Sequence, residues 1–342
     1  MTAEPPAIDL FLLAGVFPGE EDGPDADDEH GAALRHAIEY AVAAEEAGFD
    51  GVWLAEHHFL TYGACPSAVA LAAHVLGRTR RITVGTAAAI LPARHPIALA
   101  EETALLAAVS GDRFELGVGW GGPWVDLEVF GTGLSRFTDG FAADLDLLLR
   151  WLSGKASVGS DGPTHHFRPV QVIPRPPTPP RVRVAATSPA TVDLAAARGL
   201  PLLLGMHASP EEHRVLLDRH PAPQPAVAHL AYVADTVEEA RATVMPTLTE
   251  WVGRTSEYVR IDGSTGSGRD PAAYAQRLLD LHPVGDPELC VDRLRRSTEV
   301  TGASRLLLAV EAAGERKRVL QSIRRLAAEV LPAVRATRPS RP

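Results

Sequence analysis

The chain has 342 residues, of which 46% are hydrophobic and 22% charged, so its composition excludes an intrinsically disordered protein and supplies a large core. The 43 acidic residues outnumber the 33 basic ones, and the net charge of −10 disfavours binding along nucleic acid or to an anionic membrane surface. Its two cysteines, Cys65 and Cys290, exclude a disulfide framework, so we expect a cytoplasmic protein without a secretion signal or a membrane span.

Short apolar runs recur along the chain and are typical of buried β-strands. In chain order, the eight runs are 8–14, 51–55, 82–89, 114–118, 182–186, 200–204, 226–234 and 305–310. Helical patterns lie between most of them; Leu34, Ala37, Ile38 and Ala41, for example, form one apolar stripe. Continuous apolar strands that alternate with such helices favour a parallel sheet, and eight units predict a closed (β/α)8 barrel. We therefore expect residues 1–342 to form a single α/β domain, a TIM barrel.

Two segments are longer than a short strand-to-helix connection needs, namely about 153–180, after the fourth strand, and about 253–283, after the seventh. In the first, His165 to Ile173 precede a cluster of prolines, which predicts a small hairpin and a stiff return to the fifth strand. The second is interpreted either as a mobile lid over a substrate or as an exposed linker.

Seven of the ten residues from 20 to 29 are acidic, directly after the first predicted strand. A calcium site needs acids at alternating positions followed by a glutamate at a fixed offset, and this pattern is absent. The run is therefore predicted to be a solvated, self-repelling loop.

The sharpest cluster of ionisable residues is Glu56-His57-His58, which follows the second predicted strand. In a barrel, residues at this position project from the carboxyl-terminal rim, where barrel enzymes build their active sites, so we interpret the cluster as catalytic. A structural role, with the histidines hydrogen-bonded inside the rim, is the alternative. A zinc site is disfavoured, because adjacent histidines on an extended segment point to opposite sides.

Three other patterns point to chemistry less specifically. Residues 117–122 (GVGWGG) formally match G-x-G-x-x-G, but Pro123 follows them and four strands precede them, which argues against a dinucleotide fingerprint. Glycines after a barrel strand instead let a flat ring approach the backbone closely. The chain contains no G-x-S-x-G for a serine hydrolase, and no spacing indicates an activated thiolate at Cys65.

Several segments resemble the bacterial luciferase-like monooxygenase family, and the likeness is strongest to the luciferase α subunit. They are VWLAEHHF (52–59), VGTAAAILP (84–92), HP with AEE (95–96 and 100–102), GDRF (111–114) and FGT (130–132). VAATS (184–188), AARGLP (196–201) and VGDPE (284–288) match later blocks of the family. These segments span most of the chain in the right order, so the resemblance is specific.

The resemblance implies a (β/α)8 barrel that binds reduced flavin mononucleotide (FMNH2), delivered by a separate NAD(P)H-dependent flavin reductase. It also implies that O2 adds to the flavin, and that the resulting C4a-peroxide oxidises a small organic substrate in a dry pocket. His57 matches the luciferase catalytic histidine and is expected to exchange a proton, beside Glu56 and His58. Family members are commonly dimers, so a homodimer is expected.

The resemblance also assigns residues to the flavin ring. Thr86, Ala87 and Ala88 match the turn under the ring, where the family has a cis peptide between the residues that match Ala87 and Ala88. Because non-proline cis peptides are rare, this is a specific structural expectation.

The phosphate site of the family matches Thr187, Ser188 and Thr191, whose hydroxyls and helix-start amides suit a dianion. Three positions depart from the family: Gly119 replaces its reactive cysteine, Trp120 replaces the arginine that helps to hold the phosphate, and Thr187 replaces the acid beside the phosphate serine. Candidate replacements for this arginine are Arg94, Arg136 and Arg198.

An apolar substrate pocket is expected from Leu12, Phe59, Trp120, Trp124 and Met206, which favours a hydrophobic or aromatic substrate over a charged one. Three alternatives to an FMN-dependent monooxygenase stay open. The first is an oxidoreductase of the same fold that transfers hydride with the deazaflavin F420. The second is a non-catalytic flavin-binding protein or partner subunit, and the third is a metal-dependent barrel hydrolase.

Overall fold

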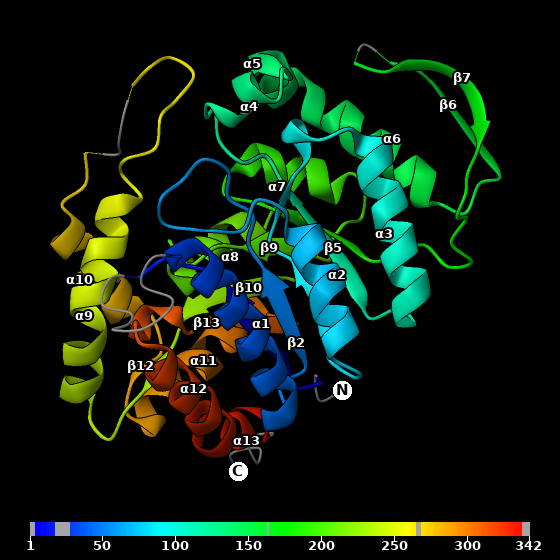
Figure 1. Cartoon of the computed structure of the whole chain (residues 1–342). Coiled ribbons are helices and arrows are strands. Elements are labelled where there is room, and N and C mark those ends of the chain that lie inside the picture. Colours follow the sequence, from blue (N-terminus) through cyan, green and yellow to red (C-terminus); the bar gives the residue numbers. More distant parts are fainter. Residues whose placement is uncertain (1–3, 18–27, 163, 265–267, 337–342) are drawn as a thin grey trace.

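The computed structural model describes residues 4–17, 28–162, 164–264 and 268–336, and its centre is a closed ring of parallel strands (Figure 1). The strands of the ring are β1 (Ala7–Leu12), β2 (Gly51–Leu54), β3 (Thr83–Thr86), β5 (Phe114–Gly119), β8 (Val182–Ala185), β9 (Leu202–Leu204), β10 (Ala226–Leu230) and β13 (Arg305–Ala309). They pair in that order, and β13 pairs back with β1, so the sheet closes on itself. Each strand overlaps one of the eight apolar runs, and the expected (β/α)8 barrel is confirmed.

Helices surround the ring of strands. The longer ones are α1 (Glu29–Ala47), α2 (Ala68–Arg78), α3 (Pro96–Ser110), α6 (Phe141–Leu152), α9 (Val237–Arg254), α10 (Pro271–Leu281), α11 (Pro287–Thr301) and α12 (Arg316–Arg325). Shorter ones are α4 (Asp126–Val129), α5 (Gly133–Ser135), α7 (Pro189–Ala196), α8 (Pro210–Leu217) and α13 (Leu331–Arg335), and further helical turns occupy Leu91–Ala93, Arg136–Gly140, Glu311–Ala313 and Leu326–Val330. A side-chain cap followed by proline starts five of the described helices, at His95, Ser188, Ser209, Asp270 and Asp286, because proline suits a first turn whose amides lack helical partners.

The first long insertion folds as an antiparallel hairpin of β6 (Ser157–Asp161) and β7 (His166–Gln171), which projects beyond α6 (Figure 1). The hairpin expected there is confirmed. In the second insertion, α10 packs beside α9 (Figure 1). Two short pairings complete the strands, β4 (Ala89–Ile90) with β5 and β11 (Tyr232–Val233) with β12 (Val284–Gly285).

The acidic run is described only at its end, because residues 20–27 lie outside the described residues. Asp28 caps α1, where its Oδ1 accepts a hydrogen bond of 3.0 Å from the amide of Gly31. Glu29 is the first residue of the helix, where the helix dipole favours a negative charge. For the rest of the run, the solvated loop stays a prediction.

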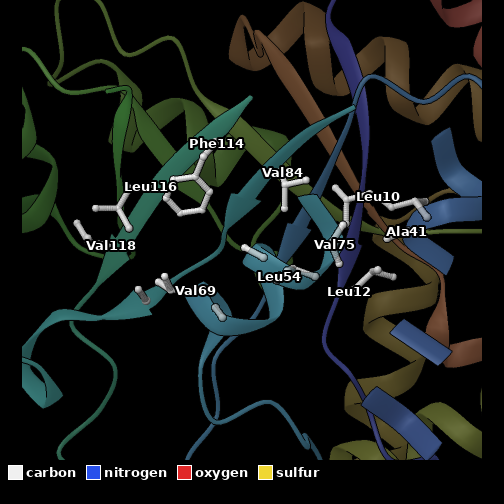
Figure 2. Packing of buried hydrophobic residues seen from close by; sticks show 14 of the residues in the cluster. Leu10, Leu12, Ala41, Leu54, Val69, Val75, Val84, Phe114, Leu116 and Val118 are labelled. Atoms are coloured by element: carbon white, nitrogen blue, oxygen red, sulfur yellow. The ribbon is translucent and has the colours of Figure 1, made fainter. Parts of the chain in front are cut away.

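The outward faces of the strands form the larger part of the core. Leu10, Leu12 and Leu54 share one buried cluster with Ala41 of α1 and Val75 of α2 (Figure 2). Successive side chains of a strand point to opposite sides of the sheet, so every second residue of β1 is committed to this layer of helices.

The barrel interior is filled near the amino-terminal ends of the strands. Asp9 Oδ2 accepts hydrogen bonds from Trp53 Nε1 at 2.7 Å and from Arg305 Nη1 at 2.6 Å. Two glycines make room for these groups, because a Cβ at Gly51 would lie 2.7 Å from the Asp9 carboxyl carbon and one at Gly85 only 2.5 Å from the Trp53 ring. Open space is therefore left at the carboxyl-terminal ends.

A buried histidine pair links the barrel to α11 and makes the stability of the fold depend on pH. His229 Nδ1 lies 3.2 Å from His282 Nδ1, His229 Nε2 lies 3.0 Å from Ser297 Oγ, and His282 Nε2 donates to the Met206 carbonyl at 2.6 Å. Only one proton fits between the two Nδ1 atoms, so the two rings cannot both be charged. Burial lowers the pKa of His282 to about 4 and that of His229 well below its usual value.

Because both pKa values are depressed by folding, the unfolded chain takes up protons first as the pH falls below about 6.5. We expect the free energy of unfolding, measured by urea denaturation, to fall between pH 6.5 and 4 by about 1.4 kcal/mol per pH unit for each histidine. His282→Asn keeps a donor for Met206 but does not titrate, and its slope is expected to be shallower. The exposed His166→Asn is the control, and equal slopes in all three proteins would contradict the assignment.

Candidate active site

Two adjoining cavities lie at the carboxyl-terminal ends of the strands. The first has a volume of about 480 Å³ and the second of about 330 Å³, and Glu56, His57 and Tyr62 line both. Cavities of this size accommodate small organic ligands. The imidazole of His57 therefore lies at the boundary between the two cavities.

Most residues that the sequence assigns to the site line one of these cavities. The first cavity is lined by Glu56, His57, His58, Ala88, Gly119, Trp120, Trp124, Thr187, Ser188 and Thr191. The second is lined by His57, Ala87 and Met206. The strands β2, β3, β5 and β8 are successive neighbours in the ring, so the residues that follow them meet on one side of the rim.

Two expected pocket residues lie elsewhere. Leu12 is buried in the outward cluster, while its neighbours Phe11 and Leu13 face the interior and line the second cavity. The expectation for Leu12 is wrong because it missed the alternation of side chains along a strand. Phe59 lines neither cavity either; it is 59% exposed and its ring packs 5.8 Å from that of Phe130.

The side chains of two residues expected to bind the cofactor, Thr86 and Arg136, make structural contacts within the protein. The Thr86 hydroxyl donates to the Gly117 carbonyl at 2.7 Å and accepts from the Gly117 amide at 2.9 Å, which fastens β3 to β5. Arg136 pairs with Asp144 at 2.5 Å and donates to the Arg94 carbonyl at 2.7 Å. Neither side chain lines a cavity, so their assignment to the cofactor is wrong.

The other two candidate cations are also engaged. Arg94 Nη2 donates to Glu56 Oε2 at 2.8 Å and to Ser67 Oγ at 3.0 Å, and Arg198 pairs with Asp146 at 2.7 Å. Among the described residues that line the two cavities, the arginine is Arg269, in the second. The side of the first cavity that carries Ser188 is built from hydroxyls and amides.

Glu56 organises the rim. Its carboxylate accepts hydrogen bonds from the amides of Ala68 and Ile90, each at 3.0 Å, in addition to those from Arg94. Burial by itself would raise the pKa of Glu56, but the hydrogen bond from His58 and the charge of Arg94 outweigh it and lower the pKa. Glu56 is thus an ionised positioning residue that ties α2, β4 and His58 together.

His57 is held as a neutral base. Burial lowers its pKa to about 4, against the opposing charge of Glu56. Its Nδ1 is buried and has no hydrogen-bond partner among the described residues, and the ring meets Tyr62 edge-on at 5.0 Å. A Cβ at Gly63 would lie 2.3 Å from Nδ1, so this glycine fixes where the imidazole can stand.

Between β3, β5 and β8, the wall of the first cavity is almost bare backbone. The peptide between Ala87 and Ala88 is cis, as the resemblance predicts. A Cβ at Gly119 would lie 3.3 Å from the Ala88 Cβ and 3.4 Å from the Ala185 Cβ. These small residues form a surface on which a flat ring can rest, and a larger residue at Gly119 would occupy it.

Ser188, Thr191 and the start of α7 line another part of this cavity. Ser188 Oγ lies 3.0 Å from Thr191 Oγ1 and caps the helix by accepting from the Thr191 amide. Hydroxyls beside the first turn of a helix, together with Thr187, are donors of the kind that bind a phosphate.

Trp120, which departs from the family, is fixed by packing. Its indole stacks on Phe141 at 3.6 Å between ring centroids, and Nε1 donates to the Phe137 carbonyl at 2.8 Å. It closes the wall of the first cavity as a rigid apolar face.

The second insertion reaches over the barrel mouth. Val125 N donates to the Val259 carbonyl at 3.1 Å, and Ile261 N donates to the Pro123 carbonyl at 2.9 Å. The rings of Tyr258 and Trp124 pack together with their centroids 4.1 Å apart. Trp124 lines the first cavity and Tyr258 the second, so this pair lies between the two cavities. The segment is therefore part of the cavity walls, not an exposed linker.

Several residues that line the cavities were not predicted from the sequence. Asp126 in the first cavity is buried, its Oδ2 has no hydrogen-bond partner among the described residues, and burial raises its pKa. Ala185 lies within a quoted family block, and Tyr62 lies five residues after His57, so proximity to a motif was their available signal. Arg269 lies in the second insertion, where no local pattern marks it.

A barrel whose carboxyl-terminal mouth holds a histidine between two cavities defines a barrel enzyme. The sequence profile of the luciferase-like monooxygenases matches residues 10–305, and the protein belongs to that family. The chain is 26% identical over 330 residues to the alkanal monooxygenase alpha chain of a Kryptophanaron alfredi symbiont, which covers 87% of this chain and 92% of that protein.

Solved structures share the fold. Monooxygenase RslO1 from Streptomyces bottropensis matches with a TM-score of 0.80 at 23% identity, covering 95% of this chain and 98% of the other. The oxygenating constituent of 3,6-diketocamphane monooxygenase from Pseudomonas putida, in complex with FMN, has a TM-score of 0.75 at 20% identity and covers 99% and 100%. An F420-dependent secondary alcohol dehydrogenase has a TM-score of 0.73 at 16% identity and covers 98% and 100%.

Two features are absent from the part of the chain that the structure describes. None of the helices found there combines the length and apolar character needed to cross a membrane. Within the same part of the chain, no group of three or more His, Cys, Asp or Glu side chains is arranged to hold a metal ion.

Proposed function

We propose that the protein is the oxygenase component of a two-component monooxygenase, which takes FMNH2 from a separate NAD(P)H-dependent flavin reductase and uses O2 to oxidise a hydrophobic organic substrate. The observation that carries the proposal is the pair of cavities that meet at His57. The first combines a bare wall for a flat ring with a phosphate-type donor set, and the second is lined largely by apolar and aromatic side chains.

In this proposal the first cavity holds FMN. The ring rests on Ala88, Gly119 and Ala185, and the phosphate binds Thr187, Ser188, Thr191 and the amides that start α7. When bound in its reduced form, FMN supplies the electrons that activate O2. The fit follows from the absence of side-chain bulk at Gly119 and from the neutral hydroxyl donors around Ser188.

The protein's own groups then control protons and water. The neutral imidazole of His57, which lines both cavities, accepts a proton from the substrate or returns one. Glu56 keeps the neighbouring His58 and the start of α2 in place. The stacked rings of Trp120 and Phe141 and the tilted pair of Trp124 and Tyr258 give the cavities apolar walls, which hinder the entry of water.

The same fold also serves F420, which transfers hydride without oxygen, so cofactor binding is the decisive experiment. We expect isothermal titration to show one FMN per chain, with weaker binding of F420. Saturation by F420 with no binding of FMN or FMNH2 would replace the monooxygenase by the hydride-transferring alternative. Riboflavin titration in the same buffer isolates what the phosphate adds.

Two further proposals concern the setting of the enzyme. A homodimer is supported by the family resemblance and by exposed apolar residues on α3, namely Leu105 at 52% and Val109 at 70% exposure. A cytoplasmic location is supported by the low cysteine count.

A further inference from the structure

The second cavity has walls made for a flat molecule. Five aromatic side chains line it, and they come from β1, the loop after β2, α9, the second insertion and α10: Phe11, Tyr62, Trp251, Tyr258 and Tyr274. Aromatic faces favour stacked or edge-on contact with a planar ligand. A cavity lined by aromatic rings alone would favour an uncharged, flat hydrocarbon as its ligand.

One part of the cavity is different, because polar groups gather there. The Arg269 guanidinium lies over the Tyr274 ring, 4.7 Å from its centroid, and His207 Nδ1 lies 2.7 Å from the Tyr274 hydroxyl. All three side chains line the cavity. Desolvation by the surrounding side chains and the charge of Arg269 lower the pKa of His207, so at neutral pH it adds a hydrogen-bonding group without a second charge.

The charge of Arg269 is not neutralised by the described protein. No carboxylate of the described residues lies within ion-pair distance of it, whereas Arg277 on the following helix α10 pairs with Glu212. The acid that lines the cavity is Glu56, whose oxygens are already engaged by two amides and Arg94. The cavity therefore presents one uncompensated cation to its ligand.

We infer that the substrate is a planar aromatic compound that carries an acidic oxygen, a carboxylate or a phenolate, bound by Arg269 with its aromatic body reaching toward His57. The guanidinium fork matches a carboxylate, and Tyr274 and His207 supply neighbouring hydrogen bonds. Arg269 is exposed, so the acidic group lies at the cavity mouth. This substrate class differs from the uncharged one that the expected pocket residues favour. Binding of such a compound does not depend on the proposed function; its oxidation by the enzyme does.

The test is a binding measurement with two matched probes, 2-naphthoate and its neutral isostere 2-naphthamide. Isothermal titration of the wild-type protein is expected to show about tenfold tighter binding of the carboxylate, the range of one charge-assisted contact at an exposed arginine. In Arg269→Gln the preference is expected to fall to within about twofold. Arg277→Gln, the same change eight residues further on, is the control and keeps the preference.

Each result has a defined meaning. Equal wild-type affinities for the two probes would overturn the inference, and so would an Arg269→Gln protein that keeps the preference. Weaker FMN binding in Arg269→Gln, with naphthoate unaffected, would place Arg269 at the cofactor phosphate and also overturn it. Failure of the monooxygenase proposal looks different, because FMN binding would then be absent while the naphthoate preference persists.

Discussion

Replacement of His57 by alanine is expected to lower the rate of substrate oxidation about 10²–10³-fold, the usual contribution of a positioned acid–base group. The reason is geometric, because His57 lines both cavities and is the neutral imidazole where they meet. The rate of product formation, measured with an added flavin reductase, checks this. FMN affinity is expected to stay within about threefold, because the bare wall at Gly119 is untouched.

A second variant separates position from chemistry. Gly63→Ala keeps the imidazole but places a Cβ 2.3 Å from Nδ1, so the ring has to move, and turnover is expected to fall. Gly77→Ala is the control, because a Cβ there meets nothing within 4 Å. Wild-type turnover in His57→Ala would remove His57 from the proposed role.

The pH dependence has a defined sign. Since the pKa of His57 is lowered to about 4, the base is already deprotonated at pH 6 and above. Loss of activity through protonation of His57 is therefore expected only below about pH 5, rather than near the ordinary histidine value of about 6.5. A rate that halves near pH 6.5, and does so in a His58→Gln variant too, would contradict a neutral His57.

Ser188→Asp is expected to weaken FMN binding about 100-fold or more while riboflavin binds as in the wild type. Aspartate caps helices as well as serine does, so α7 keeps its start. The new carboxylate, however, stands where we propose that the phosphate dianion binds, and like charges at close range repel strongly in a partly buried cavity. The difference between FMN and riboflavin affinities, both from isothermal titration, reports the phosphate alone.

Ser209→Asp provides a matched control. Ser209 caps α8 in the same way, with proline following and its hydroxyl accepting from the Glu212 amide, but it lines neither cavity. Its FMN affinity is expected to match the wild type. If Ser188→Asp also bound FMN normally, the phosphate site would have to lie elsewhere.

The strands, the closed barrel and the placement of Glu56-His57-His58 at the rim were predictable because each depends on local pattern. Apolar runs make buried strands, and a motif directly after such a strand reaches the carboxyl-terminal mouth. The cis peptide at Ala87 and the capped start of α7 at Ser188 followed from the family resemblance. Which side chains of a predicted strand face the barrel interior was harder to predict, since Leu12 of β1 points away from the cavity that Phe11 and Leu13 line.

The remainder depends on partners that are distant along the chain. Arg136 forms an ion pair with Asp144, and Arg94 forms one with Glu56, so neither guanidinium is free to bind a phosphate. No local sequence pattern indicates whether an arginine is paired with a carboxylate in the folded protein. Arg269 enters the second cavity because α10 packs beside α9 over the barrel mouth.

The sequence by itself therefore determined the barrel, its order of strands and the histidine at its mouth, because short-range periodicity and chain order are enough to place them. Only the tertiary structure decided which charges are left uncompensated and which side chains face a cavity. Those properties depend on contacts between residues almost 300 positions apart, such as Asp9 with Arg305, and they emerge once the ring of strands has closed.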